Sequence, residues 1–230
     1  AIREHLKNIP LIALTASATE KVKKDIQEKL LMKMPQVFMT SFERKNLSYT
    51  VEKSDDKINK IVAWILKSNG SGIVYCRTRR RTKEISDLLL GHQINSDFYH
   101  AGLDQDTRKE KQEDWINGKT KIIVCTNAFG MGIDKPDVRV VIHADVPDCL
   151  ENYYQEAGRA GRDGNTAHAV LLYRDAELQD LRMLPDTKFP SMEVIRKVYH
   201  ALGNYLQLPT GSGKGNYFDF VIEAFIVKFK

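Results

Sequence analysis

The sequence contains little cysteine, and its few cysteines are poorly placed for a disulfide framework or a zinc site. Among its 230 residues there are three, Cys76, Cys125 and Cys149, which are widely spaced and form no C-x-x-C pair. An odd number of separated thiols does not indicate disulfides, and the six histidines lack the spacing of zinc ligands. We therefore predict no bound structural metal and a protein of a reducing compartment, the cytoplasm.

The sequence also lacks long apolar runs and a strong excess of charge of one sign. No apolar run approaches the roughly 20 residues that a membrane-spanning helix needs, so we expect no membrane partner. The 35 basic and 30 acidic residues leave a net charge of +5, which only mildly favours a polyanionic partner. The chain begins with Ala1 and has no signal-peptide core, and we expect it to be a fragment of a longer protein.

Strand-like and helix-like patterns alternate through most of the chain. Residues 58, 61, 62, 65 and 66 are apolar at the spacing of one helix face. Asp104 suits a helix N-cap, and Gly91 and Gly118 suit helix ends. The alternation predicts an α/β fold, a parallel sheet with helices on both faces. Its predicted strands are 47–51, 72–76, 96–100, 121–126, 138–144 and 167–173, and its predicted helices are 56–68, 79–90, 105–117 and 150–157.

Both ends of the chain depart from this alternation. Near the start, apolar residues predict short strands at 10–14 and 37–40, on either side of a helix capped by Thr19. Near the end, we predict a helix at 174–184, a connector at 185–190, a helix at 191–205 and a further element from Val221. Residues 208–215 match the phosphate-loop pattern G-x-x-x-x-G-K-[ST] only in part. This pattern needs glycine where Leu208 stands and Ser or Thr where Gly215 stands, so we predict no phosphate loop here. The last part is therefore predicted to be a small, mainly helical segment.

Residues 153–164 place Arg159 and Arg162 three positions apart among three glycines. Glycine inside a helix costs about 1 kcal/mol relative to alanine, so Gly158 and Gly161 indicate a helix end close to another backbone or a ligand. The planar guanidinium groups suit phosphate oxygens. Taken alone, the stretch fits equally well a solvated loop with salt bridges.

The context of this stretch resembles a known family. Residues 126–136 are similar to motif V, and residues 155–164 to motif VI, of the RecQ branch of superfamily 2 DNA helicases, without a gap in either motif. Residues 14–19 resemble motif III apart from Ser17, and residues 41–47 resemble the crossing between two RecA-like domains. The resemblance covers residues 11 to about 184.

This resemblance implies a domain organisation. Residues 1–43 would be the C-terminal remnant of a first RecA-like domain, residues 44–184 the second RecA-like helicase domain, and residues 185–230 the start of a truncated helical or winged-helix-like region. RecQ proteins mostly carry four zinc-ligating cysteines in that last region. This chain has no cysteine after Cys149, so it resembles a zinc-free variant.

An open α/β sheet binds ligands at the carboxyl ends of its strands, and polar residues follow three of the predicted strands. Arg77 and Thr78 stand where motif IV contacts nucleic acid, although a solvated helix face is an open alternative for the basic run at 77–83. The resemblance also implies contacts with single-stranded DNA from four more residues, namely His100, Gly102, Thr126 and Asn127.

For the nucleotide, the resemblance implies that Gly132, Asp134, Arg159 and Arg162 face ATP. Arg162 would be the arginine finger, with Arg159 as the nearer alternative, and Gln155 would couple ATP hydrolysis to DNA. The cofactors implied are ATP and Mg²⁺, with the ion held mainly by the first RecA-like domain, whose phosphate loop would precede Ala1. We therefore expect this chain alone to hydrolyse no ATP.

The function implied is that of a 3′–5′ ATP-dependent DNA helicase with a role in repair or recombination. Its expected partners are single-stranded DNA, duplex junctions and the first RecA-like domain of the same full-length chain, and its expected place is the bacterial cytoplasm, with the nucleoid. One alternative is a DEAD-box RNA helicase, which is disfavoured because its motif VI has a histidine and other arginine spacing where this chain has Gln155, Arg159 and Arg162. The other is a noncatalytic nucleic-acid-binding module.

Overall fold

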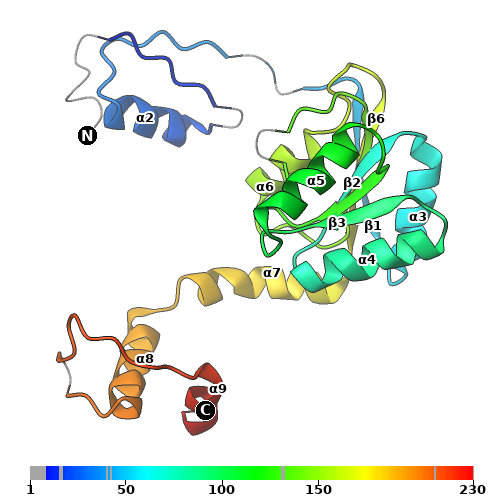
Figure 1. Cartoon of the computed structure of the whole chain (residues 1–230). Coiled ribbons are helices and arrows are strands. Elements are labelled where there is room, and N and C mark those ends of the chain that lie inside the picture. Colours follow the sequence, from blue (N-terminus) through cyan, green and yellow to red (C-terminus); the bar gives the residue numbers. More distant parts are fainter. Residues whose placement is uncertain are drawn as a thin grey trace. The chain divides into compact units, whose positions relative to one another are not determined.

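The structure is a computed structural model that describes residues 9–15, 18–39, 41, 43–130, 133–209 and 211–229. Contacts divide the chain into two units, Ala1–Leu178 and Gln179–Lys230, which are described separately. The helices and strands, labelled in Figure 1, are α2 (Glu20–Lys29), β1 (Leu47–Lys53), α3 (Lys57–Ser68), β2 (Ser71–Tyr75), α4 (Arg79–Gly91), β3 (Ser96–Tyr99), α5 (Gln105–Ile116), β4 (Ile122–Cys125), β5 (Val138–His143), α6 (Leu150–Ala157), β6 (Ala167–Tyr173), α7 (Asp175–Lys188), α8 (Met192–Tyr205) and α9 (Ile222–Lys228).

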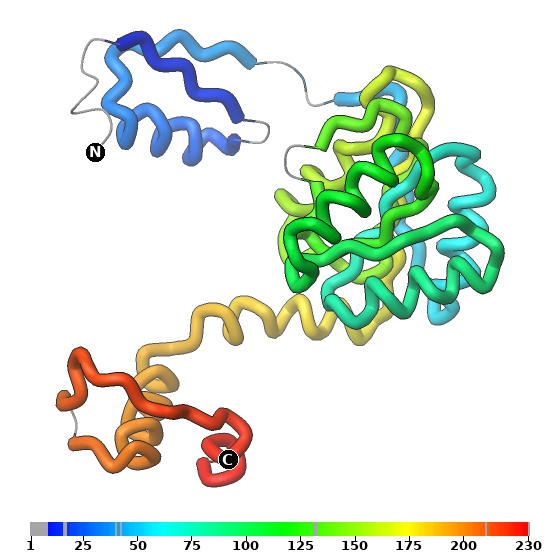
Figure 2. The backbone as a smooth tube through the Cα atoms, viewed as in Figure 1, coloured from blue at the N-terminus to red at the C-terminus, as the bar shows by residue number. Residues whose placement is uncertain are grey.

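The six described strands form one sheet in the order β1-β6-β5-β2-β4-β3, and every neighbouring pair is parallel. The central strand β2 sets Ile73 opposite Ile123 of β4 and Val141 of β5. At one edge, Leu47 of β1 pairs with Ala167 of β6, so that segments far apart in the sequence lie side by side (Figure 2). The predicted α/β fold with a parallel sheet is confirmed.

Side chains alternate between the two faces of this sheet and form a separate apolar core on each. On one face, Ile73 and Ile123 belong to a cluster with Trp115 of α5 and Ala157 of α6. On the other, the neighbouring Val74 packs with residues of α3 and α4, namely Ile61, Ile65, Ile85 and Leu89. Burying one such aliphatic side chain contributes about 1.5–3 kcal/mol. The prediction of helices on both faces is confirmed (Figure 1).

The predicted helix ends are largely confirmed, with one correction. Asp104 caps α5 by accepting a hydrogen bond from the Thr107 N–H at 2.9 Å, and Gly118 follows this helix with φ of +77°. Gly91, in contrast, does not stop α4. It is the last residue of the helix, and the left-handed residue is Gln93, with φ of +59°. The chain can therefore reverse without glycine, because His92 already donates to the carbonyls at the helix end.

The strands predicted before the sheet are wrong within the part of the chain that the structure describes. Residues 10–14 and 37–39 have no strand, and Thr40 and residues 16–17 of the motif III-like turn lie outside the described residues. A strand needs a partner strand for its backbone groups, and an apolar run alone does not supply one. Leu14 and Phe38 are 92% and 88% exposed. The helix between them, α2, is present with Thr19 as its N-cap.

The second unit is helical, and its connector is shorter than predicted. We expected residues 185–190 to link two helices, but α7 continues through Pro185 to Lys188. Proline removes one backbone donor, yet the Pro185 carbonyl still accepts a hydrogen bond from the Phe189 N–H at 2.8 Å. The predicted helix from Ser191, its N-cap, is present as α8, and the element after Val221 is α9. No described helix is long and apolar enough to cross a membrane.

The division between Leu178 and Gln179 falls inside α7. The assignment of residues 1–43 and 185–230 to neighbouring domains of a helicase stays a prediction.

Candidate functional site

The residues predicted to bind nucleic acid come together at the carboxyl ends of three neighbouring strands. Because β2, β4 and β3 are adjacent and parallel, the loops that follow them emerge side by side at their carboxyl ends. We call these three loops the carboxyl-end loops. They carry six predicted residues, namely Arg77, Thr78, His100, Gly102, Thr126 and Asn127.

The loop after β2 is organised by a carboxylate that the sequence analysis missed. Asp145, which follows β5, accepts a hydrogen bond from the Arg77 N–H at 2.9 Å and lies 3.1 Å from the Arg81 guanidinium. The Arg77 guanidinium is 3.6 Å from Asp148 and stays 35% exposed. Thr78 is the N-cap of α4, since its hydroxyl oxygen accepts from the Arg81 N–H at 3.3 Å. The cations therefore stay at the surface while the backbone is fixed from below.

The loop after β3 differs from the expectation for Gly102. We expected Gly102 to contact single-stranded DNA, but its backbone N–H already donates to Nδ1 of His100 at 3.2 Å. A Cβ on Gly102 would lie 2.8 Å from Nη1 of Arg79, so this guanidinium covers the glycine. The His100 ring lies 5.7 Å from the ring of Phe98. Arg79 was missed because only the fold brings it beside this loop, whereas Phe98 stands two residues before His100 and could have been found from the sequence.

The loop after β4 presents one of its two predicted residues to solvent. Thr126 is buried, and its N–H donates to the Tyr99 carbonyl at 3.3 Å, whereas Asn127 is exposed. Asn127 also lines a cavity of about 210 Å³ beneath the edge, together with Arg77 and Asp145. Deeper in this cavity, His143 Nε2 lies 2.9 Å from the Glu156 carboxylate.

The two predicted arginines lie in the connection between α6 and β6, residues 158–166, which we call the arginine loop. Arg159 is buried, and its Nη1 donates to the Gly130 carbonyl. A Cβ on Gly130 would overlap the Arg159 guanidinium, and the φ of +128° at Gly130 also requires glycine. Arg159 therefore packs into the turn that resembles motif V.

Arg162 has a different environment. Its Nη1 donates to the Ile133 carbonyl at 3.0 Å and to Asp134 Oδ1 at 2.8 Å. The Arg162 side chain is 36% exposed and that of Asp134 is 81% exposed. Within the described residues, its Nη2 and Nε make no hydrogen bond. Asp134 thus pairs with a motif VI arginine, whereas Gly132 lies outside the described residues.

Gln155 is exposed on the last turn of α6, and its side-chain amide makes no hydrogen bond with another described residue. Its neighbour Glu156 is buried and bonded to His143. Gln155 is thus near the arginine loop in the chain but is not part of its contacts.

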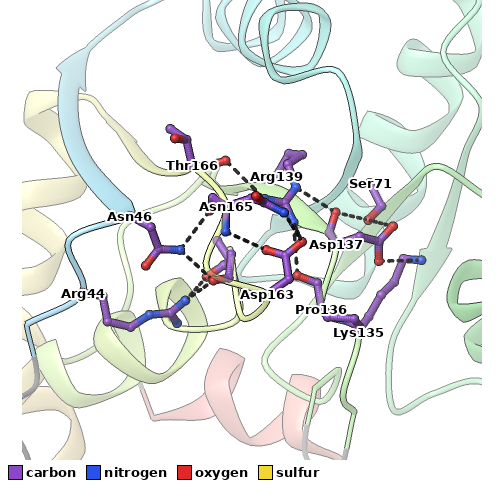
Figure 3. Close-up of polar contacts among 12 residues, drawn as sticks. Arg44, Asn46, Ser71, Lys135, Pro136, Asp137, Arg139, Asp163, Asn165 and Thr166 are labelled. Carbon is purple, nitrogen blue, oxygen red and sulfur yellow. Dashed lines mark hydrogen bonds and ion pairs between the residues drawn. The ribbon is translucent and has the colours of Figure 1, made fainter.

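Polar contacts fix the arginine loop at the amino ends of the strands (Figure 3). The Arg139 guanidinium donates to the Asp163 carboxylate, to the Pro136 carbonyl at 3.2 Å and to the Thr166 carbonyl at 3.3 Å. This guanidinium holds the pKa of the Asp163 carboxyl well below its usual range. Asn165 adds two hydrogen bonds to the same carboxylate, each 3.0 Å long.

Among the described residues, no group of three or more His, Cys, Asp or Glu side chains is placed to hold a metal ion. The zinc-free character of the chain stays a prediction.

Residues 56–164, from the cap of α3 to the arginine loop, match the family described as Helicase conserved C-terminal domain. Among solved structures, the fold is similar to that of Saccharomyces cerevisiae Dbp5 bound to RNA and ADP BeF3, with a TM-score of 0.60 and 20% identity, over 76% of this chain and 48% of that one. This likeness shows the fold alone.

Among curated proteins, the RecQ-like DNA helicase BLM of Xenopus laevis is 45% identical over 80% of this chain and 14% of its own length. The ATP-dependent DNA helicase RecQ of Bacillus subtilis is 41% identical over 76% of this chain and 30% of its own length. A protein of Acanthamoeba polyphaga mimivirus, described by name as an ATP-dependent RNA helicase, is 47% identical over 74% of this chain and 32% of its own length. The chain thus spans a third or less of the length of these relatives. It carries the helicase conserved C-terminal domain of the RecQ-like DNA helicases.

Proposed function

We propose that this chain is the second RecA-like domain of an ATP-dependent DNA helicase. In this proposal Arg162 completes the nucleotide site as an arginine finger, and the carboxyl-end loops bind single-stranded DNA. The two sites lie at opposite ends of the strands, because the arginine loop is near their amino ends and the proposed DNA-binding loops are at their carboxyl ends. The domain therefore suits a role in which ATP turnover at one end of the strands changes the affinity for DNA at the other end.

The observation that carries the proposal is the contrast between the two motif VI arginines. Arg159 is buried against Gly130, while Arg162 is partly exposed and oriented by Asp134. A guanidinium held by one nitrogen keeps its remaining donors for phosphate oxygens, and a planar fork binds them in pairs. The exposed Asp134 carboxylate can accept hydrogen bonds from ribose hydroxyls. These residues fit one half of a nucleotide site.

The other half, with the phosphate loop and most Mg²⁺ ligands, is proposed to belong to the first RecA-like domain. Bound ATP with Mg²⁺ would supply the phosphoryl group whose transfer to water releases energy. Arg162 would stabilise the charge that spreads over that group in the transition state, and Asp134 would keep the guanidinium oriented. Arg159 would support the motif V-like turn from inside.

Binding of a single strand is supported by the chemistry of the carboxyl-end loops. Arg77 and Arg79 provide cations for the phosphate backbone, Asn127 provides an amide, and the Phe98 and His100 rings provide apolar surface. Such contacts give affinity with little sequence preference. DNA is favoured over RNA because the RecQ-like relatives are named as DNA helicases.

The test is steady-state ATPase activity of the full-length protein with saturating single-stranded DNA or RNA. We expect DNA to stimulate turnover, and Arg162→Ala to lower kcat on the order of 10³-fold or more while ATP affinity changes little. Arg162→Lys should fail as well, because a point charge does not replace the fork. Arg174→Ala, which removes an arginine that follows β6 and lies outside both the arginine loop and the three carboxyl-end loops, is the matched control.

Each other outcome excludes part of the proposal. Near-normal turnover of Arg162→Ala, or a loss explained by weaker ATP binding, would remove the finger assignment. Stimulation by RNA alone would favour an RNA helicase, as the name of the mimivirus relative suggests for that protein. A full-length protein without ATPase activity would be a noncatalytic binding module.

A further inference from the structure

An arginine from outside motif VI makes the densest set of contacts to the arginine loop. Nη1 of Arg44 donates to the Gly158 carbonyl at 2.8 Å, and Nη2 donates to the carbonyls of Ala160, at 2.9 Å, and Gly161. Arg44 lies three residues before β1, and 114 residues of sequence separate it from Gly158. Figure 3 shows its side chain beside that of Asn46, both directed toward the arginine loop.

These carbonyls lie at and just after the carboxyl end of α6, which has Gly158 as its C-cap. The last carbonyls of a helix have no partner within the helix and carry partial negative charge. A cation is therefore favourable there, and a guanidinium can donate to several carbonyls at once. Arg44 serves as this cap from a segment that is remote in the sequence.

The same turn carries both motif VI arginines, so its backbone path decides where their side chains begin. Gly161 has φ of +62°, and its N–H donates to the Val138 carbonyl at 2.8 Å. Its carbonyl accepts from Asn46 Nδ2 at 2.7 Å in addition to Arg44. A Cβ at Gly161 would lie 2.7 Å from Asn46 Nδ2 and 2.8 Å from the Asn165 carbonyl. The Gly161 backbone is thus hydrogen-bonded both to the segment that enters β1 and to the start of β5.

We propose that Arg44 is a positioning residue for Arg162, through which the segment that enters β1 sets the placement of the arginine finger. This inference rests on the proposed function of Arg162. Arg44 touches neither Arg162 nor any group proposed to react, and acts on the backbone from which Arg162 extends. Because the Arg44 carbonyl also accepts from the Leu47 N–H at 3.0 Å, a shift of residues 43–46 would move the carbonyl contacts and β1 entry together.

The sheet itself does not need Arg44. Strand β1 is held along its whole length by its pairing with β6, from Leu47–Ala167 to Lys53–Tyr173, and both apolar cores lie beyond Arg44. Loss of the guanidinium should leave the fold and loosen the turn. A displacement of about 1 Å in a catalytic group can lower a rate by about 10²-fold.

The experiment compares Arg44→Ala, Arg44→Lys and the control Arg174→Ala in the full-length protein. Arg174 is a matched control because its Nη2 also donates to a backbone carbonyl, that of Asp55, at 2.7 Å, away from the arginine loop. We expect Arg44→Ala to lower kcat by about 10- to 100-fold with nucleotide affinity within about twofold. Arg44→Lys should recover only part of the loss, since a single ammonium nitrogen cannot occupy the positions of both Nη1 and Nη2. Arg174→Ala should keep normal turnover.

A double variant separates positioning from general damage. If Arg44 acts through Arg162, then adding Arg44→Ala to Arg162→Ala should lower single-turnover hydrolysis no further, whereas independent effects would multiply. A multiplied loss, or normal kcat in Arg44→Ala, would overturn the inference about Arg44 while leaving the finger intact. Normal kcat in Arg162→Ala would instead overturn the proposed function.

Amide hydrogen exchange on the 230-residue chain checks the structural step without nucleotide. In Arg44→Ala, the Gly161 and Asp163 N–H groups, which donate to Val138 and Pro136, should exchange at least tenfold faster, while amides of β2 stay unchanged. Unchanged exchange at Gly161 would overturn the inference. If Arg44→Ala loses protection in β2 as well, Arg44→Gln, which keeps much of the side-chain volume, is compared by the same measurements and decides the question.

Discussion

The arginine loop and the carboxyl-end loops present arginines at opposite ends of the strands, and they hold these arginines in different ways. In the arginine loop, backbone carbonyls accept hydrogen bonds from Arg44, Asn46 and Arg139, and Gly161 leaves no space for a side chain. In the carboxyl-end loops, the backbone is fixed by Asp145 and by the Thr78 cap, while Arg77 extends to the surface. In the first arrangement the Arg162 guanidinium is hydrogen-bonded to Ile133 and Asp134, whereas in the second the Arg77 guanidinium lies 3.6 Å from Asp148, beyond hydrogen-bond distance.

This difference fits the demands of the two proposed ligands. A transferring phosphoryl group needs a cation at one place, because electrostatic stabilisation depends on preorganised geometry. A sliding nucleic-acid backbone offers a phosphate at each nucleotide, so surface cations can bind it without a fixed geometry. Within motif VI itself, two arginines three residues apart differ in the same respect, because Arg159 is buried and Arg162 is partly exposed.

The largest effect on folding should come from the buried member of that pair. Arg159→Ala removes a donor from the Gly130 carbonyl and leaves a cavity, so we expect about 2 kcal/mol lower stability. Arg162→Ala should change the free energy of unfolding by less than about 0.5 kcal/mol. Urea unfolding of the chain followed by tryptophan fluorescence measures both, since Trp64 and Trp115 both lie in the sheet unit. Equal destabilisation by the two variants would contradict the contrast.

The sheet could be predicted from the sequence because its causes are local. Alternating apolar periodicities mark strands and helices, and caps such as Asp104 and Thr19 are read within four residues. Contacts across the fold leave no such local signal. Arg44, Asp145 and Arg79 were missed because only the folding of the sheet brings their partners close. The hydrogen bond from the Gly102 N–H to His100 depends instead on the local geometry of the loop.

Two local predictions failed for physical reasons of the same kind. The apolar segment 10–14 has the composition of a strand, but no partner strand lies beside it in the described residues. Pro185 indicates a helix end, yet α7 passes through it. In each case the sequence shows a tendency, and the available hydrogen-bond partners decide the outcome. The site residues stay predictions because their test requires the ligands.

Gln155 should affect the coupling between the proposed nucleotide site and the proposed DNA-binding loops. We expect Gln155→Ala to keep most basal ATPase activity while DNA stimulation falls by about tenfold, because the exposed amide next to the arginine loop is free to respond to the bound strand. ATPase rates measured against single-stranded DNA concentration in the full-length protein give both values. Glu151→Ala, an exposed change on the first turn of the same helix, should leave stimulation normal. Equal loss of basal and stimulated rates would assign Gln155 to chemistry instead.

The carboxyl-end loops should show the smaller, salt-dependent effects of surface cations. Arg77→Ala should weaken single-stranded DNA binding by about three- to tenfold near 0.1 M salt, and should reduce the slope of log affinity against log salt by somewhat less than one. Fluorescence anisotropy at several salt concentrations measures both. Lys60→Ala removes the same charge from α3, where Lys60 pairs with Glu52, and should leave the slope unchanged. An unchanged slope in Arg77→Ala would favour the solvated helix face.

The smallest effect should be the pH dependence of the arginine loop's anchor. Arg139 lowers the pKa of the Asp163 carboxyl in the folded protein, so the ionised form is favoured by folding. The resulting stability is present above the unfolded-state pKa, near 4, and is lost as the pH falls through that value toward the lower folded-state pKa. The urea midpoint of Asp163→Asn should therefore lie below that of the unmodified chain at pH 6, and the difference should shrink as the pH falls to 3. Asp87→Asn, an exposed change on α4, is the control and should show no such convergence. A gap between Asp163→Asn and the unmodified chain that stays constant over this range would mean that the ion pair with Arg139 does not stabilise the loop.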